Sequence, residues 1–171
     1  GRIQIELAFE PTLGLKAAVE TVCQQAVDAV RAGKTLMILS DRHVTEDQWV
    51  VSAAMATGAV HHRLIEEGLR CSANIIVDTA EARDSHHFAV LLGFGATAVY
   101  PYLSYRVIND LVESDEIVGD PLELHRNYRK GINKGLLKIL SKMGISTIAS
   151  FRGAQLFEAV GLSNEIVDLC F

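Results

Sequence analysis

Short apolar segments alternate with helical patterns along most of this chain. Residues 2–9 alternate apolar and polar side chains in the manner of a half-buried strand. Apolar runs predict further strands at residues 35–39, 74–77, 96–100 and 145–150. Strands that alternate with helices pair in parallel through right-handed crossovers, so this order indicates a mainly parallel sheet.

The helical segments are marked by apolar periodicity, capping residues and glycine stops. They are predicted at residues 14–32, 45–68, 84–92, 103–112 and 122–143, with two short helices at 153–160 and 163–169. Thr45 is the candidate N-cap of the second helix, and Asp84 or Ser85 is the candidate N-cap of the third.

The fold class follows from this order and from the length of the chain. Strands built from continuous apolar runs are typical of a sheet covered on both faces. A closed eight-stranded barrel needs about 250 residues, whereas this chain has 171. We therefore expect an α/β protein of repeated strand–helix units, either a partial, half-barrel-like structure or an open α/β sheet.

An acidic, loop-like stretch from Glu113 to Pro121 is the best candidate linker. It predicts an α/β core over residues 1–120 and a second part over residues 121–171, in which a basic helix, a strand and short helices pack on that core. Five basic residues recur at four-residue intervals on the helix and share one face: Arg126, Lys130, Lys134, Lys138 and Lys142. This face is either solvated or a docking surface for an acidic partner.

Composition narrows the class of protein. The net charge of −5 argues against a nucleic-acid-binding protein, which usually has a basic surface. No apolar run approaches the roughly 20 residues that span a bilayer, and the start of the chain does not resemble a signal peptide. We expect a cytoplasmic protein with no membrane partner. Its three cysteines lack paired spacing, so neither a disulfide framework nor a metal or iron–sulfur site is predicted.

Candidate functional residues follow the predicted strands, because parallel α/β folds place their sites at the carboxyl ends of strands. This rule selects Ser40–Arg42, Asp78–Arg83, Tyr100–Tyr102 and Ser150–Gly153. The acidic and arginine side chains of these clusters either line a polar channel or pair with one another. Ser150, Arg152 and Gly153 follow a predicted strand and begin a predicted helix, so they are the candidate anion site.

Two histidine doublets, His61-His62 and His86-His87, are the strongest candidates for metal ligands. Adjacent residues on a helix point about 100° apart, so one doublet cannot hold a single ion well. A site that combines His62 with His86 or His87 is the alternative. We predict no metal site, and histidines that pack and form hydrogen bonds near helix ends.

Several segments resemble the large chain of bacterial glutamate synthase, in the same order along the chain. They are Leu39–Arg42, Ala59–His62, Gly68–Arg70, Glu81–Ala89, Leu92–Ala96, Tyr100–Leu103 and the long stretch Asn127–Leu162. The resemblance covers nearly the whole sequence. It implies the later part of the family's central domain and the connector toward its flavin domain.

In that family an amidotransferase domain releases ammonia from glutamine, and the ammonia passes through an internal tunnel to a flavin and iron–sulfur domain that makes glutamate from 2-oxoglutarate. The resemblance implies a structural and ammonia-channelling role between these two partner domains, with no catalytic residue in this chain. The family's FMN and iron–sulfur cluster map onto no residue here. Six residues would be tunnel-rim or loop-anchor residues: Asp41, Arg42, Glu81, Arg83, His86 and His87.

Two other interpretations remain open. One is a small enzyme domain that binds an anion or a flavin phosphate through its strand-end loops, since barrel-like folds often carry phosphate sites. The other is self-association through an exposed sheet edge or apolar face.

Overall fold

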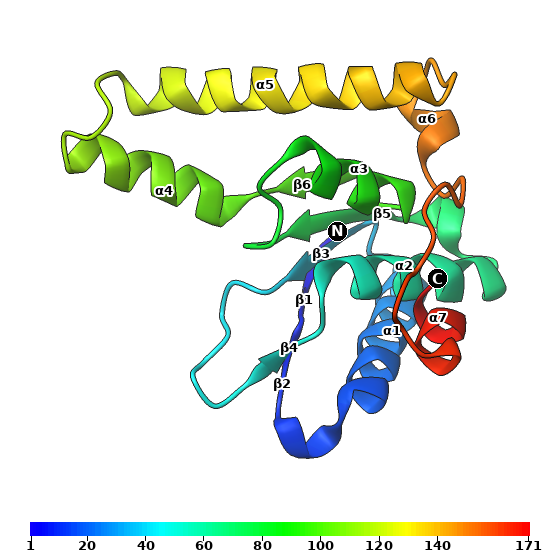
Figure 1. Ribbon diagram of the computed structural model, residues 1–171. Helices are drawn as coiled ribbons and strands as arrows, with labels where there is room; N and C mark the ends of the chain where they lie inside the picture. Colours follow the sequence, from blue (N-terminus) through cyan, green and yellow to red (C-terminus); the bar gives the residue numbers. More distant parts are fainter.

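The computed structural model describes all 171 residues and contains a four-stranded parallel sheet. Its strands lie in the order β1 (Arg2–Glu6), β3 (Leu36–Ser40), β5 (Asn74–Asp78) and β6 (Ala98–Tyr100). The connecting helices are α1 (Leu15–Arg31), α2 (Ala53–Glu66) and α3 (Ser85–Gly93) (Figure 1). The prediction of an α/β fold with a mainly parallel sheet is confirmed. The sheet does not close, which is consistent with the open form of the two that were expected.

The three helices cover one face of the sheet. Alternate strand residues are fully buried on that face, among them Ile5, Met37, Leu39, Ile75 and Val77. Helix α2 lies at the centre of the layer and packs against α1, α3 and two strands. Small residues on α2, such as Ala56 and Ala59, let these neighbours approach closely.

The opposite face of the sheet is not covered in the same way. The side chain of Leu36 is 40% exposed there, and Ile38 and Ile76 are only half-buried. The prediction that both faces are covered is therefore wrong for this chain. The apolar runs arise because one face packs under helices while the other still carries several aliphatic side chains.

A small antiparallel ladder replaces the first part of the predicted helix at 45–68. Strand β2 (Ala8–Phe9) pairs with β4 (Trp49–Val50), and the backbone N–H of Val51 donates to the carbonyl of Leu7. This ladder keeps the chain extended as far as Ser52, so α2 begins only at Ala53. The strand predicted at residues 2–9 is correspondingly interrupted at Leu7.

Two further helices form an arm beside this body. Helix α4 (Tyr102–Glu113) leaves the end of β6, and α5 (Pro121–Lys142) returns along it and packs across α3 (Figure 1). Asp120 caps α5 by accepting from the Glu123 N–H at 3.0 Å. The core-facing side of α5 carries Ile132, Leu136 and Leu140, whereas its predicted basic stripe is exposed.

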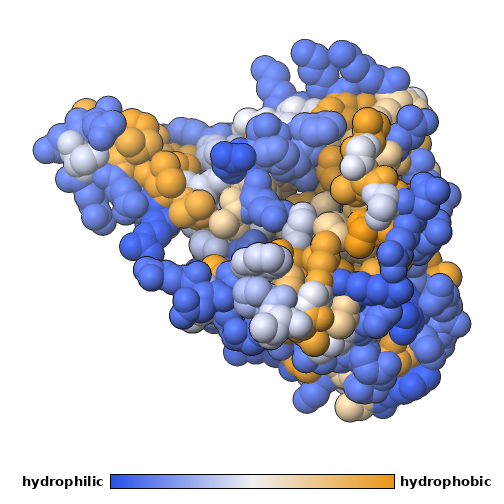
Figure 2. Space-filling view, turned by 60° about the horizontal axis from the view of Figure 1, so that its bottom comes forward, coloured by the Kyte–Doolittle hydropathy of each residue, from blue (hydrophilic) through white to orange (hydrophobic).

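The arm also exposes apolar side chains, as the space-filling view shows (Figure 2). Leu103 and Val107 lie one turn apart on α4 and are 39% and 45% exposed. Val118, in the connecting loop, is 95% exposed. None of the helices has the combination of length and apolar composition needed to cross a bilayer.

The C-terminal segment differs from the sequence prediction. Residues 145–150 form no strand; instead Thr147 caps a short helix, α6 (Ile148–Phe151), and accepts from the Ser150 N–H. The helix predicted at 153–160 is also absent. Gly153 and Gln155 have positive φ values of 69° and 52°, which a right-handed helix excludes, and the Gly153 N–H is bound to the Gly93 carbonyl.

Helix α7 (Asn164–Cys170), predicted at 163–169, is present and packs on α2. Two short 3₁₀ turns, η1 (Pro11–Leu13) and η2 (Arg70–Ser72), complete the chain. Ile132 of α5, Phe151 of α6 and Cys170 of α7 join the same hydrophobic cluster as the sheet. The domain boundary proposed at residue 120 stays a prediction.

Replacement of Gly135 by Ala should destabilise the protein by about 1–3 kcal/mol, because a methyl group there would overlap the Ser85 hydroxyl where α5 crosses α3. Gly131→Ala, one turn earlier in open space, is the matched control and should stabilise by about 0.5–1 kcal/mol through helix propensity. Urea unfolding measures both. Equal effects of the two substitutions would contradict the packing of α5 on α3.

Candidate functional site

A row of polar residues crosses the carboxyl edge of the sheet. Glu6, Ser40, Asp78 and Tyr100 are in register on neighbouring strands, so their side chains share one face. The Ser40 hydroxyl donates to Asp78 Oδ2 at 3.0 Å. The parallel pairing thus places residues from four separate stretches of sequence side by side.

Arg42 contacts two residues of this row, Asp78 and Tyr100, and also Tyr102. Its Nε and Nη2 atoms donate to the two carboxylate oxygens of Asp78 at 3.0 and 2.8 Å. Its guanidinium also lies over the ring of Tyr102, 4.3 Å from the centroid, and 5.6 Å from that of Tyr100. The hydrogen bonds that Arg42 donates to Asp78 raise the pKa of Arg42 above its ordinary value. Arg42 is therefore bound on several sides by this chain.

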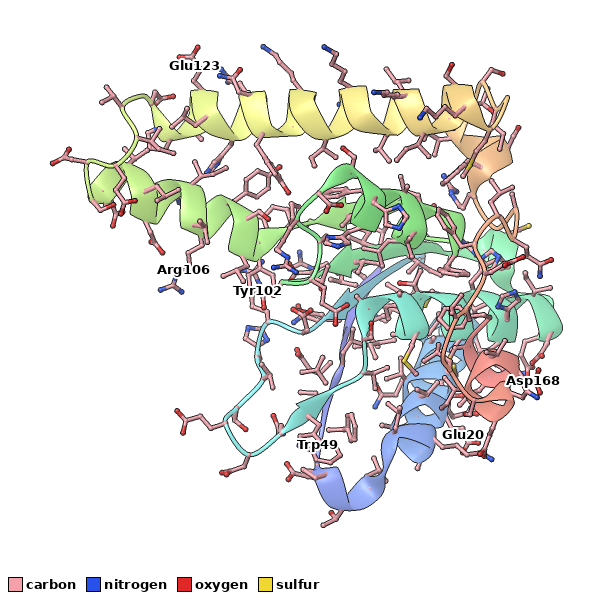
Figure 3. All side chains as sticks on the ribbon, in the orientation of Figure 1. Glu20, Trp49, Tyr102, Arg106, Glu123 and Asp168 are labelled. Carbon is pink, nitrogen blue, oxygen red and sulfur yellow. The ribbon has the colours of Figure 1, made fainter.

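Asp41 anchors the loop after β5. Its side chain is buried and accepts hydrogen bonds from the Thr79 hydroxyl and the Ala80 N–H. Tyr102 lies at the start of α4 beside these strand ends (Figure 3). Burial raises the pKa of Tyr102 to about 12, and the Asp41 carboxylate adds to this effect. Asp41 therefore ties the ends of β3 and β5 to α4.

The other four predicted residues share a cleft of about 430 Å³ at the start of α2 and α3. Its walls are Ala54, Glu81, Ala82, Arg83, His86, His87, Val90 and Leu91. The structure thus divides the six predicted tunnel-rim residues into two groups, with Asp41 and Arg42 at the sheet edge and the remainder around the cleft.

Glu81 fixes one wall of the cleft. Its Oε2 atom accepts from the Ser52 hydroxyl at 3.1 Å and from the Ala53 N–H at 3.0 Å. These bonds satisfy a backbone donor at the start of α2, where a negative charge is also favoured by the helix dipole. Glu81 therefore caps α2 from a distant loop, in the place that Thr45 was predicted to occupy.

His87 and Arg83 fix the opposite wall. The Nδ1 atom of His87 accepts from the Arg83 N–H at 3.2 Å, which places the proton of the neutral ring on Nε2. Asp84 caps α3, as predicted, by accepting from the N–H groups of His86 and His87. These bonds, led by that from His87, lower the pKa of Asp84. The Arg83 carbonyl accepts from the Tyr128 hydroxyl at 2.9 Å, which links this wall to α5.

No group of three or more His, Cys, Asp or Glu side chains is placed to hold a metal ion. The imidazole of His62 forms a hydrogen bond with the Gly58 carbonyl, on its own helix. The ring of His86 instead packs edge-on against Phe157, with 5.9 Å between centroids. The two histidine doublets thus have separate surroundings.

The predicted anion site has a different local structure from the one expected. Ser150 is exposed, and its hydroxyl lies 3.0 Å from that of Thr147. No helix begins at Gly153, so the expected strand–turn–helix geometry is absent. Arg152 is half-buried, and its Nε atom is buried without a hydrogen-bond partner.

His61 is a neighbour of Arg152 that the sequence analysis did not connect with it. A Cβ atom added to Gly95 or Gly153 would clash with the His61 ring, so both glycines allow close approach. The Nε atom of Arg70 donates to Nδ1 of His61 at 2.8 Å. Burial, followed by the charge of Arg70, lowers the pKa of His61 to about 4. Because Gly95 and Gly153 are far apart in the sequence, the sequence alone does not indicate that both lie against the His61 ring.

The comparisons with known proteins identify the family. Residues 2–163 match the family model described as "Glutamate synthase central domain". The chain belongs to the glutamate synthase central-domain family. This confirms the resemblance found in the sequence.

Relatives of this central domain occur in fungi, plants and bacteria. It is 40% identical to the NADH glutamate synthase of Schizosaccharomyces pombe, over 98% of this chain and 8% of that protein. It is 45% identical to ferredoxin-dependent glutamate synthase 1 of Arabidopsis thaliana, over 92% of this chain and 10% of that protein. It is 41% identical to the NADPH glutamate synthase large chain of Bacillus subtilis, over 92% of this chain and 10% of that protein. The chain thus spans about a tenth of the length of the curated relatives it matches.

A solved structure shares the fold of the central domain. A flavocytochrome b2 variant with benzoylformate superposes with a TM-score of 0.57 at 13% identity, covering 94% of this chain and 44% of that one. At this identity the likeness concerns the fold alone.

Asp41→Ala should lower the free energy of unfolding by about 2–4 kcal/mol, because it leaves the buried Thr79 hydroxyl and the Ala80 N–H without an acceptor. Asp47→Ala, at an exposed position, is the control and should change it by less than about 0.5 kcal/mol. Urea denaturation compares them. A loss of stability as small as that of the control would show that Asp41 anchors nothing.

The stability of the protein should fall as the pH is lowered from about 6.5 to about 4. In this window the unfolded chain protonates His61, whose ordinary pKa is 6.5, while the folded protein keeps it neutral. The difference corresponds to at most about 3 kcal/mol. His61→Gln should remove this part of the pH dependence, and His43→Gln, at an exposed position, should retain it. Parallel stability–pH curves for the native chain and His61→Gln would refute the assignment.

Proposed function

We propose that this chain is part of the central domain of a glutamate synthase, where it holds an amidotransferase domain and a flavin domain in register. The match of residues 2–163 to the family model carries this proposal. The relatives, of which the chain matches only about a tenth, are named as glutamate synthases. On this proposal the chain contributes to glutamate formation from glutamine and 2-oxoglutarate without catalysing it alone.

The side-chain network at the sheet edge supports a scaffolding role. Asp78 is bound by Ser40 and Arg42, and Asp41 is bound by Thr79 and Ala80. Partly buried charges with such partners hold loops in one conformation. A rigid edge of this kind suits a domain that fixes the separation between two active sites.

The cleft between α2 and α3 is the part of this chain that we propose to border the ammonia path. Small and aliphatic residues, including Ala54, Ala82 and Val90, form much of its lining. Its one carboxylate, Glu81, is bound to the start of α2, so it is engaged rather than free to take part in proton transfer. The other polar side chains of the lining are those of Arg83, His86 and His87, and we propose that the aliphatic part of the walls borders the path of uncharged ammonia.

The cofactor assignment is part of the same proposal. FMN and the iron–sulfur cluster would be held by other parts of the parent polypeptide. The partner surfaces on this chain would be those that face these parts. The exposed basic stripe of α5 and the exposed apolar side chains of the arm are available for such contacts.

Filling the cleft tests the channelling role in the full-length enzyme. Ala54→Trp should reduce glutamine-dependent glutamate formation about tenfold, and ammonia released from glutamine should appear in solution. Synthesis from saturating added ammonia should stay near the native rate, because that ammonia reaches the second site directly. Ala149→Trp, on the exposed side of α6, is the control. An equal loss with both nitrogen sources would count against channelling and indicate a general structural defect.

A titration of the 171-residue chain with FMN tests the alternative of a flavin-phosphate-binding enzyme domain. The scaffold proposal expects no saturable change in flavin absorbance or fluorescence. Saturable micromolar binding that Arg152→Ala abolishes would overturn the scaffold proposal and favour the enzyme domain.

A further inference from the structure

Arg70 is a partly buried cation whose partners in this chain are all neutral. Its Nε donates to His61 Nδ1 at 2.8 Å, its Nη1 to the Ala73 carbonyl at 2.7 Å and its Nη2 to the Gly95 carbonyl at 2.9 Å. A guanidinium carries five N–H groups, so two remain without an acceptor. No carboxylate forms an ion pair with Arg70. This differs from Arg42, whose charge is balanced by Asp78.

The Arg152–Gly153 turn lies on the other side of the same imidazole ring. The N–H of the next residue, Gly153, donates to the Gly93 carbonyl at 2.8 Å, which fixes the backbone there. A Cβ atom on Gly153 would lie only 2.8 Å from His61 Nε2. Arg70 therefore approaches the Nδ1 side of His61, and the Arg152–Gly153 turn approaches the Nε2 side.

The Arg152 side chain is not satisfied by this chain. Its Nε atom is buried and has no hydrogen-bond partner, and no ion pair involves its guanidinium. Buried polar groups nearly always have a partner, so each exception in a folded protein needs an explanation. A bound acceptor that the chain itself does not supply is one such explanation.

The electrostatic interactions in this cluster also indicate that a balancing negative charge is missing. Burial, followed by the charge of Arg152, lowers the pKa of Arg70. Partly buried charges are costly unless an opposite charge balances them. His61, neutral and accepting at Nδ1, carries its proton on Nε2 and adds a donor rather than a negative charge.

We infer that Arg70, Arg152 and Nε2–H of His61 form a binding site for an oxyanion, either a phosphate or a carboxylate. Guanidinium groups bind both through paired N–H donors. The oxyanion has two possible sources, a small free anion or a carboxylate side chain on an adjoining domain. Both sources supply the same chemistry at this site, and experiment separates them.

The first arm of the test titrates the 171-residue chain with inorganic phosphate at constant ionic strength and follows the Tm. A free anion should raise the Tm by about 4 °C when its concentration is ten times the Kd, and further with the logarithm of its concentration. Arg152→Ala should abolish the shift, and Arg152→Lys should weaken it by removing the planar fork. Arg106→Ala, an exposed arginine that points into solvent from α4, is the matched control and should preserve it (Figure 3).

The second arm applies if the source is a carboxylate of an adjoining domain, and it alone rests on the proposed function. In that case phosphate leaves the Tm of the chain unchanged. Arg152→Ala should then lower the Tm of the full-length enzyme by several degrees, while Arg106→Ala should not. Activity with added ammonia reports separately whether the enzyme remains a functional glutamate synthase. If neither arm responds specifically to Arg152, the oxyanion site is refuted even where the proposed function holds.

Discussion

Burial of one face of a parallel sheet under α1, α2 and α3 is the constraint on which the rest of the structure depends. Strand residues on that face, including Leu39, Ile75 and Val77, are fully buried. Each buried aliphatic side chain of this size contributes about 1.5–3 kcal/mol. The layer forms because α2 buries both small residues, such as Ala56 and Ala59, and longer side chains, such as Val60 and Leu64. Once this face is fixed, the strand ends have defined positions, and so have their loops.

Those loops are joined by hydrogen bonds between distant parts of the chain. Asp41 reaches from the end of β3 to the loop after β5, and Glu81 reaches from that loop to the start of α2. Tyr128 then connects α5 to the start of α3 through the Arg83 carbonyl. The acidic residues of the strand ends therefore act mainly within the protein. By contrast, Arg70 and Arg152 have charges that no residue of the chain balances, and this contrast distinguishes a structural network from a binding site.

Local sequence patterns predicted the elements that depend on local features. The heptad-like apolar spacing of Val19, Val22 and Ala26 and the capping carboxylate of Asp84 are sufficient to define α1 and the start of α3. The rule that functional residues follow the carboxyl ends of parallel strands likewise selected Asp41, Arg42 and Glu81, since it depends only on where an apolar run stops. The grouping of these residues into a sheet-edge network and a cleft could not be predicted, because it depends on partners such as Ser52 and Thr79 in other loops.

The failures arose where a capping hydrogen bond or a tertiary contact overrides the apolar pattern. Residues 145–150 have the composition of a strand, but Thr147 offers its hydroxyl to the Ser150 N–H and a helical turn forms instead. The start of α2 was misplaced because its cap comes from Glu81, far along the chain, rather than from Thr45. In the same way, the closeness of His61 to Gly95 and Gly153 exists only in the folded chain.

The order of the strands has a consequence for how such a domain is made. Because β1, β3, β5 and β6 neighbour one another in the sequence in which they are synthesised, each new strand meets an edge that is already present. The sheet can therefore grow one strand–helix unit at a time as the polypeptide leaves the ribosome, without waiting for distant segments. In a polypeptide of great length, this form of assembly limits the time during which unpaired strand edges are available to other chains.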